Sequence, residues 1–110
     1  MNVQIETRGQ ITVLHLKGEL DSTHCIRERP GVPDVTESGA RVVLDLADVP
    51  YINSAGISEL VQLAAAANTR GAHLVLAQPS AFVEQVLETT HLDRFFELAP
   101  TLDEAVQKLS

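Results

Sequence analysis

The stretch Val49-Pro50-Tyr51-Ile52-Asn53-Ser54-Ala55-Gly56-Ile57-Ser58-Glu59-Leu60 joins two segments with different apolar patterns. Before it, residues 41–46 (RVVLDL) form a nearly continuous apolar run, which predicts a buried strand. After it, apolar residues recur at helical spacing, at Ile57, Leu60, Val61, Ala64 and Ala67. The small polar residues 53–56 therefore lie at the N-terminus of a predicted helix over residues 55–69.

A helix N-terminus carries backbone N–H groups without intrahelical partners, and the helix dipole favours negative charge there. Ser54 at this place has two interpretations. It is either an ordinary N-cap, contributing about 1 kcal/mol, or a hydroxyl at which a phosphoryl group would be tolerated. The residues alone leave both interpretations open.

The composition is that of one globular domain, which we expect to span residues 1–110. Apolar residues make up 45% of the chain, enough for a modest core. Fifteen acidic residues against eight basic ones give a formal charge of −7, which argues against a nucleic-acid partner because such a partner requires a clustered basic face. The charge favours a partner with a basic surface.

Compartment signals favour the cytoplasm. Cys25 is the single cysteine, so no intrachain disulfide can form and a reducing environment is the simpler assumption. Residues 1–6 have neither the basic start nor the apolar core of a secretory signal. No apolar run approaches the roughly 20 residues of a membrane span, so we expect no direct membrane insertion.

The N-terminal third predicts a hairpin and a poor helix. Residues 3–8 and 11–17 alternate or are rich in β-branched residues, and Gly9-Gln10 supplies the turn between them. A helix expected after Asp21 is interrupted by Pro30 and Pro33, which predicts that it is short or distorted.

The C-terminal half predicts further strands and helices. Residues 73–78 form an apolar strand stopped by Pro79, and 95–98 a short extended segment. Ser80 and the capping box at 101–104 each open a helix. The first of these helices carries an apolar face, and the second has apolar residues that are expected to point inward. They are Phe82, Val83, Val86 and Leu87 in the first and Leu102, Ala105, Val106 and Leu109 in the second. Alternation of strands and helices predicts a mixed α/β domain.

Residue patterns for catalysis or metal binding are weak. The four histidines are scattered, and neither a Gly-x-Ser-x-Gly elbow nor a phosphate-binding loop occurs. Asp45 and Asp48 could be imagined as a phospho-acceptor or Mg²⁺ pair, but solvated or capping carboxylates are the favoured interpretation. We expect no metal, no cofactor and no catalytic residue, so an enzyme is the least favoured class.

Several segments together resemble the STAS family, which includes bacterial anti-sigma factor antagonists and cytoplasmic domains of sulfate transporters. They are residues 16–21 (LKGELD), 42–46 (VVLDL), 49–57 (VPYINSAGI) and the tail from 91 to 106. The resemblance implies one STAS-like α/β domain: a mixed sheet of four to five strands packed with about four helices.

The resemblance also implies a function. Regulated antagonists of the family typically read Asp-Ser-Ser/Thr-Gly at this motif, and a serine in it is phosphorylated by an anti-sigma factor that is itself a serine kinase. Asn53 stands at the aspartate, Ser54 at the first hydroxyl, Ala55 at the second and Gly56 at the glycine. Ser54 is thereby the phosphorylation candidate, and the partner-binding residues would be Asn53, Ser54, Ala55, Gly56, Ile57, Ser58 and Asp21.

Two alternatives stay open. The chain could be a STAS scaffold or transport-complex subunit without phospho-regulation, whose partners are other STAS proteins or transporter subunits. It could also be a small anion- or nucleotide-binding domain that uses the same helix N-terminus.

Overall fold

Five strands lie side by side in one sheet in the order of the chain, β1-β2-β3-β4-β5. The computed structural model describes residues 2–18 and 39–109. Within them the strands are β1 (Asn2–Arg8), β2 (Ile11–Lys17), β3 (Arg41–Asp48), β4 (His73–Ala77) and β5 (Glu97–Ala99). The helices are α1 (Ser54–Arg70), α2 (Ala81–Thr89) and α3 (Leu102–Leu109), with a 3₁₀ turn, η2 (Leu92–Arg94), before β5.

The sheet is mixed, as the order of elements predicts. β1 and β2 are antiparallel, and pairing of Arg8 with Ile11 leaves a two-residue turn. Gly9 in that turn has φ 63°, a left-handed conformation that glycine adopts at little cost. The pairs β2·β3, β3·β4 and β4·β5 are parallel, so each needs a crossover connection.

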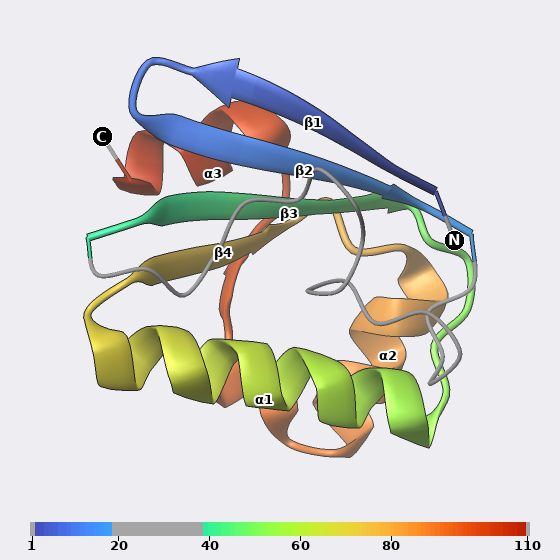
Figure 1. Cartoon of the computed structure of the whole chain (residues 1–110). Helices are drawn as coiled ribbons and strands as arrows, with labels where there is room; N and C mark the ends of the chain where they lie inside the picture. The colour runs from blue at the N-terminus through green and yellow to red at the C-terminus, as the bar shows by residue number, and fades with distance from the viewer. Residues whose placement is uncertain (1, 19–38, 110) are drawn as a thin grey trace.

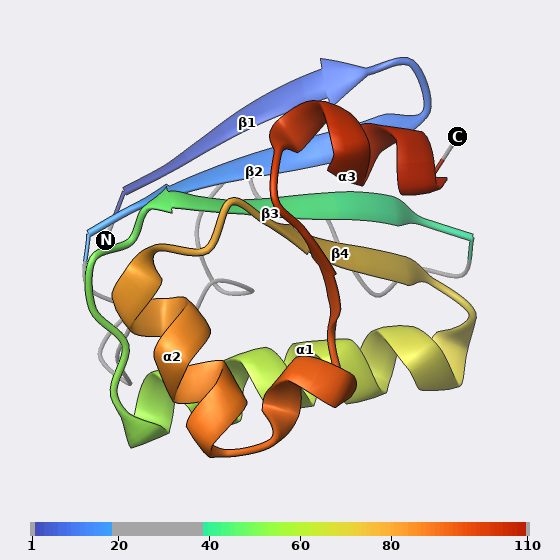
Figure 2. The ribbon, with the colours of Figure 1, turned by 180° about the vertical axis from the view of Figure 1, so that it is seen from behind.

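Helices cover both faces of the sheet, with α1 and α2 on one side and α3 on the other (Figures 1 and 2). Alternate strand residues point to opposite faces. One face packs leucines against α1 and α2, namely Leu14, Leu16, Leu44, Leu46 and Leu76. The other packs smaller side chains against α3, namely Val13, Val43, Val75, Ala77 and Ala99. The two faces form two separate apolar cores.

The helix boundaries agree closely with the local signals. α1 begins one residue before the predicted range and ends one residue after it, at Arg70. Gly71 follows as the C-cap, and its φ of 77° is the left-handed conformation of such a cap. Ser80 caps α2 by accepting a hydrogen bond from the Val83 N–H at 3.3 Å. Thr101 likewise accepts from the Glu104 N–H at 3.1 Å. Both predicted caps are confirmed.

Some side-chain and strand predictions are wrong. Phe82 does not face inward: it is 44% exposed, while Val83 and Leu87 of the same helix are fully buried. The extended segment near residue 95 forms β5 two residues later than predicted, because η2 takes up residues 92–94. β4 ends at Ala77, since Gln78 turns away with φ 55°.

The distorted first helix, with Pro30 and Pro33, lies outside the described residues, as do Asp21 and Cys25. Three α-helices are seen in the described ranges, against about four expected for the whole chain.

Candidate partner-binding site

Asn53, and not Ser54, is the N-cap of α1. Its backbone is extended, with φ −105° and ψ −179°. Its side-chain Oδ1 accepts a hydrogen bond from the Gly56 N–H at 2.8 Å, and its carbonyl accepts from the Ile57 N–H at 2.9 Å. This is the usual geometry of an asparagine cap. The interpretation of Ser54 as the cap is therefore wrong.

Ser54 occupies the first helical position and is exposed to solvent. Within the described part of the chain, its hydroxyl enters no hydrogen bond, and neither do the N–H groups of Ser54 and Ala55. The first turn contains no acidic residue that would offset the positive end of the helix dipole. The hydroxyl is thus both accessible and placed where added negative charge is tolerated.

The loop that presents Ser54 is anchored at both ends. Val49 and Ile52 are buried in the core, at 0% and 2% exposure. The Ser80 hydroxyl, which also caps α2, donates to the Val49 carbonyl at 2.9 Å. α2 accordingly lies next to the N-terminal end of α1 in both views (Figures 1 and 2). These contacts hold the helix N-terminus in a defined position.

An exposed aromatic pair lies on this loop and on α2. Tyr51 is 42% exposed and stacks on Phe82, with ring centroids 5.3 Å apart and planes 29° apart. A mainly apolar groove of about 310 Å³ continues from Phe82 along α2, lined by Phe82, Gln85, Val86, Thr89 and Thr90. We call Tyr51, Phe82 and this groove the aromatic surface.

The predicted site residues differ in accessibility. Ser54 and Ser58 are exposed, and their spacing of four places them on one side of α1. Asn53, Ala55 and Ile57 are half-buried, and Gly56 is buried. Contact with a partner is thus open mainly to Ser54 and Ser58, with Asn53 and Gly56 forming the support beneath them.

Sequence patterns do not predict two contacts around this site. They are the stacking of Tyr51 on Phe82 and the hydrogen bond from Ser80 to the loop. Ser80 is recognisable only as a cap. The signal for the aromatic pair is weak, because Tyr51 and Phe82 are 31 residues apart and meet only when α2 packs beside the loop.

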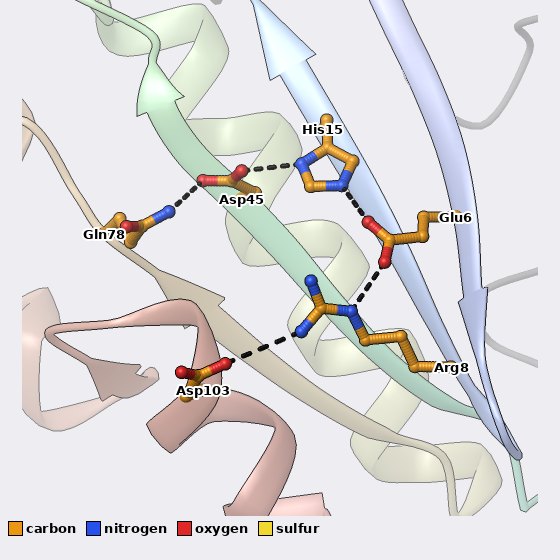
Figure 3. A network of polar contacts seen from close by, with 6 residues as sticks. All are labelled: Glu6, Arg8, His15, Asp45, Gln78 and Asp103. Atoms are coloured by element: carbon orange, nitrogen blue, oxygen red, sulfur yellow. Dashed lines mark hydrogen bonds and ion pairs between the residues drawn. The ribbon is translucent and has the colours of Figure 1, made fainter.

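Asp45 and Asp48 do not form a pair. Asp45 is 9% exposed, and its carboxylate accepts hydrogen bonds from the Ala47 N–H and from Gln78 Nε2, both at 3.0 Å. It also contacts His15 (Figure 3). Asp48 is exposed at the end of β3. The interpretation favoured by the sequence is a solvated or capping carboxylate. For Asp45 the solvated state is wrong, because partners from β2 and from the end of β4 contact it, whereas its bond from the Ala47 N–H is a local capping contact.

Residues 2–18 and 39–109 contain neither a metal-binding cluster nor a membrane-spanning helix. No group of three or more His, Cys, Asp or Glu side chains in these ranges is arranged to hold a metal ion. None of the helices in the same ranges has the length and apolar character needed to cross a bilayer.

The chain belongs to the STAS domain family, whose model matches residues 2–105. The matched residues include all five strands of the mixed sheet and the N-terminus of α1.

Individual relatives are anti-sigma factor antagonists by name. A Thermotoga neapolitana protein, described as a candidate anti-sigma factor antagonist homologue, is 30% identical over 69 residues, which are 63% of this chain and 61% of the relative. The match thus spans less than two thirds of that relative. A crystal structure of a candidate antagonist from Thermotoga maritima superposes with a TM-score of 0.81 at 21% identity, covering 97% of this chain and 93% of that one.

The Bacillus cell fate determinant SpoIIAA, also an anti-sigma factor antagonist, shares the fold. Its phosphorylated form superposes with a TM-score of 0.70 at 20% identity, covering 99% of this chain and 100% of that one. Its unphosphorylated form gives a TM-score of 0.74 at 21% identity, covering 98% and 96%.

Proposed function

We propose that the chain is a non-enzymatic, cytoplasmic anti-sigma factor antagonist, with residues 1–110 acting as one STAS domain. It binds an anti-sigma factor that is a serine kinase, and phosphorylation of Ser54 by that kinase releases it. The partner meets the residues predicted from the motif, Asn53 to Ser58 and Asp21.

The observation that carries this proposal is that Asn53 caps α1 while Ser54, the next residue, is exposed. Because Asn53 caps the helix, the Ser54 hydroxyl is exposed and takes no part in holding the fold. A kinase can therefore reach it without opening the structure. The STAS relative SpoIIAA, whose structures include a phosphorylated form, supports a phosphorylated state for a protein of this fold.

The electrostatics favour a switch that acts on binding. A phosphate adds about −1.5 to −2 charges, and at a helix N-terminus the dipole and the unpaired N–H groups stabilise them. In an interface formed around a neutral hydroxyl, the same charges must lose their hydration, which costs free energy. Phosphorylation thus weakens the complex and leaves the domain folded.

The aromatic surface extends the proposed contact area. Exposed Tyr and Phe side chains next to an apolar groove are the composition found in the centre of protein interfaces. A net charge of −7 suits a partner with a basic rim.

A kinase assay tests the proposal. Each serine-kinase anti-sigma factor of the source organism is purified and incubated with the chain and ATP, and the modified residue is located by mass spectrometry. We expect one kinase to bind the chain and to add a single phosphate, at Ser54.

The neighbouring serine provides the matched control. Ser58 is exposed on the same side of α1 and belongs to the proposed contact, so Ser58→Ala should still acquire its single phosphate at Ser54, whereas Ser54→Ala should acquire none. If no kinase modifies the wild type and Ser54→Glu binds every tested partner as well as the wild type does, the proposed switch is wrong.

The aromatic surface also favours a second function, that of a STAS scaffold or transport-complex subunit. Tyr51 and Phe82 can bind a protein whether or not Ser54 is modified. A pull-down that recovers another STAS protein or a transporter subunit, lost in Phe82→Ala and unchanged in Ser54→Glu, would favour this scaffold.

A further inference from the structure

His15, in the middle of the sheet on the face that carries α3, lies between two carboxylates. Its Nδ1 is 2.7 Å from Asp45 Oδ2 on β3, and its Nε2 is 2.8 Å from Glu6 Oε1 on β1 (Figure 3). The His15 side chain is 29% exposed and that of Asp45 is 12% exposed. The Glu6 side chain is 40% exposed. The contact with Asp45 is therefore largely shielded from water, whereas the contact with Glu6 lies at the surface of the sheet.

The geometry determines the protonation state. A neutral imidazole has one N–H donor and one nitrogen lone pair, whereas an imidazolium has two donors. Both ring nitrogens of His15 face carboxylate oxygens, which only accept hydrogen bonds when ionised. Beside two ionised carboxylates, a neutral ring would point one lone pair at an oxygen, so only the imidazolium satisfies both contacts.

We propose that His15 is held as an imidazolium and acts as a proton-dependent clamp that joins β1, β2 and β3 across the sheet. This proposal does not depend on the proposed function. It assigns a conformational role to a group of residues of which the sequence patterns singled out Asp45 alone.

The clamp continues on both sides of His15. On one side, Asp45 Oδ1 accepts from the Ala47 N–H and from Gln78 Nε2, just past the end of β4. On the other, Glu6 Oε2 accepts from Arg8 Nε at 2.6 Å, and Arg8 Nη1 is 3.7 Å from Asp103 Oδ1 at the start of α3 (Figure 3).

The charges around His15 retain its proton. Those facing it are the carboxylates of Glu6 and Asp45, with Arg8 and Asp103 beyond Glu6 and with Lys17 exposed two residues further along β2. Partial burial lowers the pKa of His15, but the hydrogen bonds to Glu6 and Asp45 outweigh it and raise the pKa above its ordinary 6.5. The hydrogen bond from Arg8, and then that from His15, lowers the pKa of Glu6 below 4.5.

These directions define a pH window. Folding raises the pKa of His15. Its contribution to the stability of the folded state is therefore complete below pH 6.5 and is lost as pH rises through the folded pKa. Folding lowers the pKa of Glu6. Its contribution to the stability of the folded state is therefore complete above pH 4.5 and is lost as pH falls through the folded pKa. The clamp is strongest between these two values.

The clamp reaches the strand that leads to the site of Ser54. Asp45 accepts a hydrogen bond from the Ala47 N–H. Ala47 lies two residues before Val49, which is buried and begins the loop that carries the cap Asn53. Loss of the His15 proton therefore loosens the hairpin β1–β2 and the end of β3 first.

Nitrogen NMR of the wild-type chain tests the protonation directly. In a long-range ¹H–¹⁵N spectrum at pH 7, we expect both ring nitrogens of His15 to have the shifts of an imidazolium, with titration above pH 6.5. A neutral tautomer at pH 7 would overturn the proposal, and this readout needs no variant that could fail to fold.

Unfolding experiments test the consequence. Wild type and His15→Gln are unfolded by denaturant from pH 5.5 to 9, with His73→Gln as control because His73 is exposed at the start of β4. The ratio of the two folding constants, wild type over His15→Gln, should fall as pH rises, about tenfold for each unit by which folding raises the pKa of His15. A ratio that does not change with pH would contradict the clamp. So would an equal fall in the corresponding ratio of wild type over His73→Gln.

Discussion

At the scale of single residues, the cap and the switch are separate side chains, and substitution distinguishes them. Asn53→Ala removes the acceptor of the Gly56 N–H and should lower the free energy of unfolding by about 1 kcal/mol. Ser54→Ala removes an exposed hydroxyl and should change it by less than about 0.5 kcal/mol. Urea denaturation measures both. A larger loss for Ser54→Ala than for Asn53→Ala would show that the cap is assigned to the wrong residue.

Residue patterns predict that a helix begins near residue 54 but do not decide which side chain caps it. Asn and Ser are about equally good caps, and they are adjacent here. Only the backbone shows that Asn53 is extended and Ser54 helical. The amide oxygen of Asn53 therefore supplies the cap of α1.

Asp45 shows a second limit at this scale. It lies inside an apolar strand, where a carboxylate is costly to bury without a partner. Its partner His15 is 30 residues earlier in the chain, and its donor Gln78 is 33 residues later. No local pattern reports such contacts, because they arise only when β2, β3 and the end of β4 become neighbours.

At the scale of elements, the two sides of α2 can be told apart by stability. Leu87→Ala removes a fully buried side chain and should cost about 2–5 kcal/mol. Phe82→Ala removes an exposed ring and mainly its contact with Tyr51, which should cost about 0.5–1.5 kcal/mol.

Thermal or denaturant unfolding of the two variants measures this difference. The proposed interface also predicts an effect on binding. Phe82→Ala should weaken partner binding while the domain stays folded. Equal destabilisation by the two substitutions would mean that Phe82 is part of the core, as the helical pattern alone suggests.

Elements with strong local signals could be predicted, and the others could not. β3, α1 and β4 follow from apolar periodicity and from the cap at Gly71, so their predicted bounds differ from the structure by two residues or fewer. β5 has only three residues and is defined by pairing with Val75 to Ala77 of β4. A strand of this kind depends on its neighbour more than on its own composition.

At the scale of the whole molecule, phosphorylation should leave the fold intact. The two apolar cores lie on the faces of the sheet, and Ser54 belongs to neither. A phosphate at the helix N-terminus should leave the free energy of unfolding unchanged or raise it by up to about 1 kcal/mol. Denaturant unfolding of the Ser54-phosphorylated and unmodified chains measures this, and a loss of several kcal/mol would contradict a switch that acts on binding alone.

The most direct test of the account compares the affinity of the partner for the two forms of the chain. The anti-sigma factor identified by the kinase assay is titrated by calorimetry with unmodified chain and with chain phosphorylated at Ser54. We predict that phosphorylation weakens binding at least about tenfold, or about 1.4 kcal/mol, while circular dichroism stays unchanged. Equal affinity of the two forms would contradict Ser54 as a release switch.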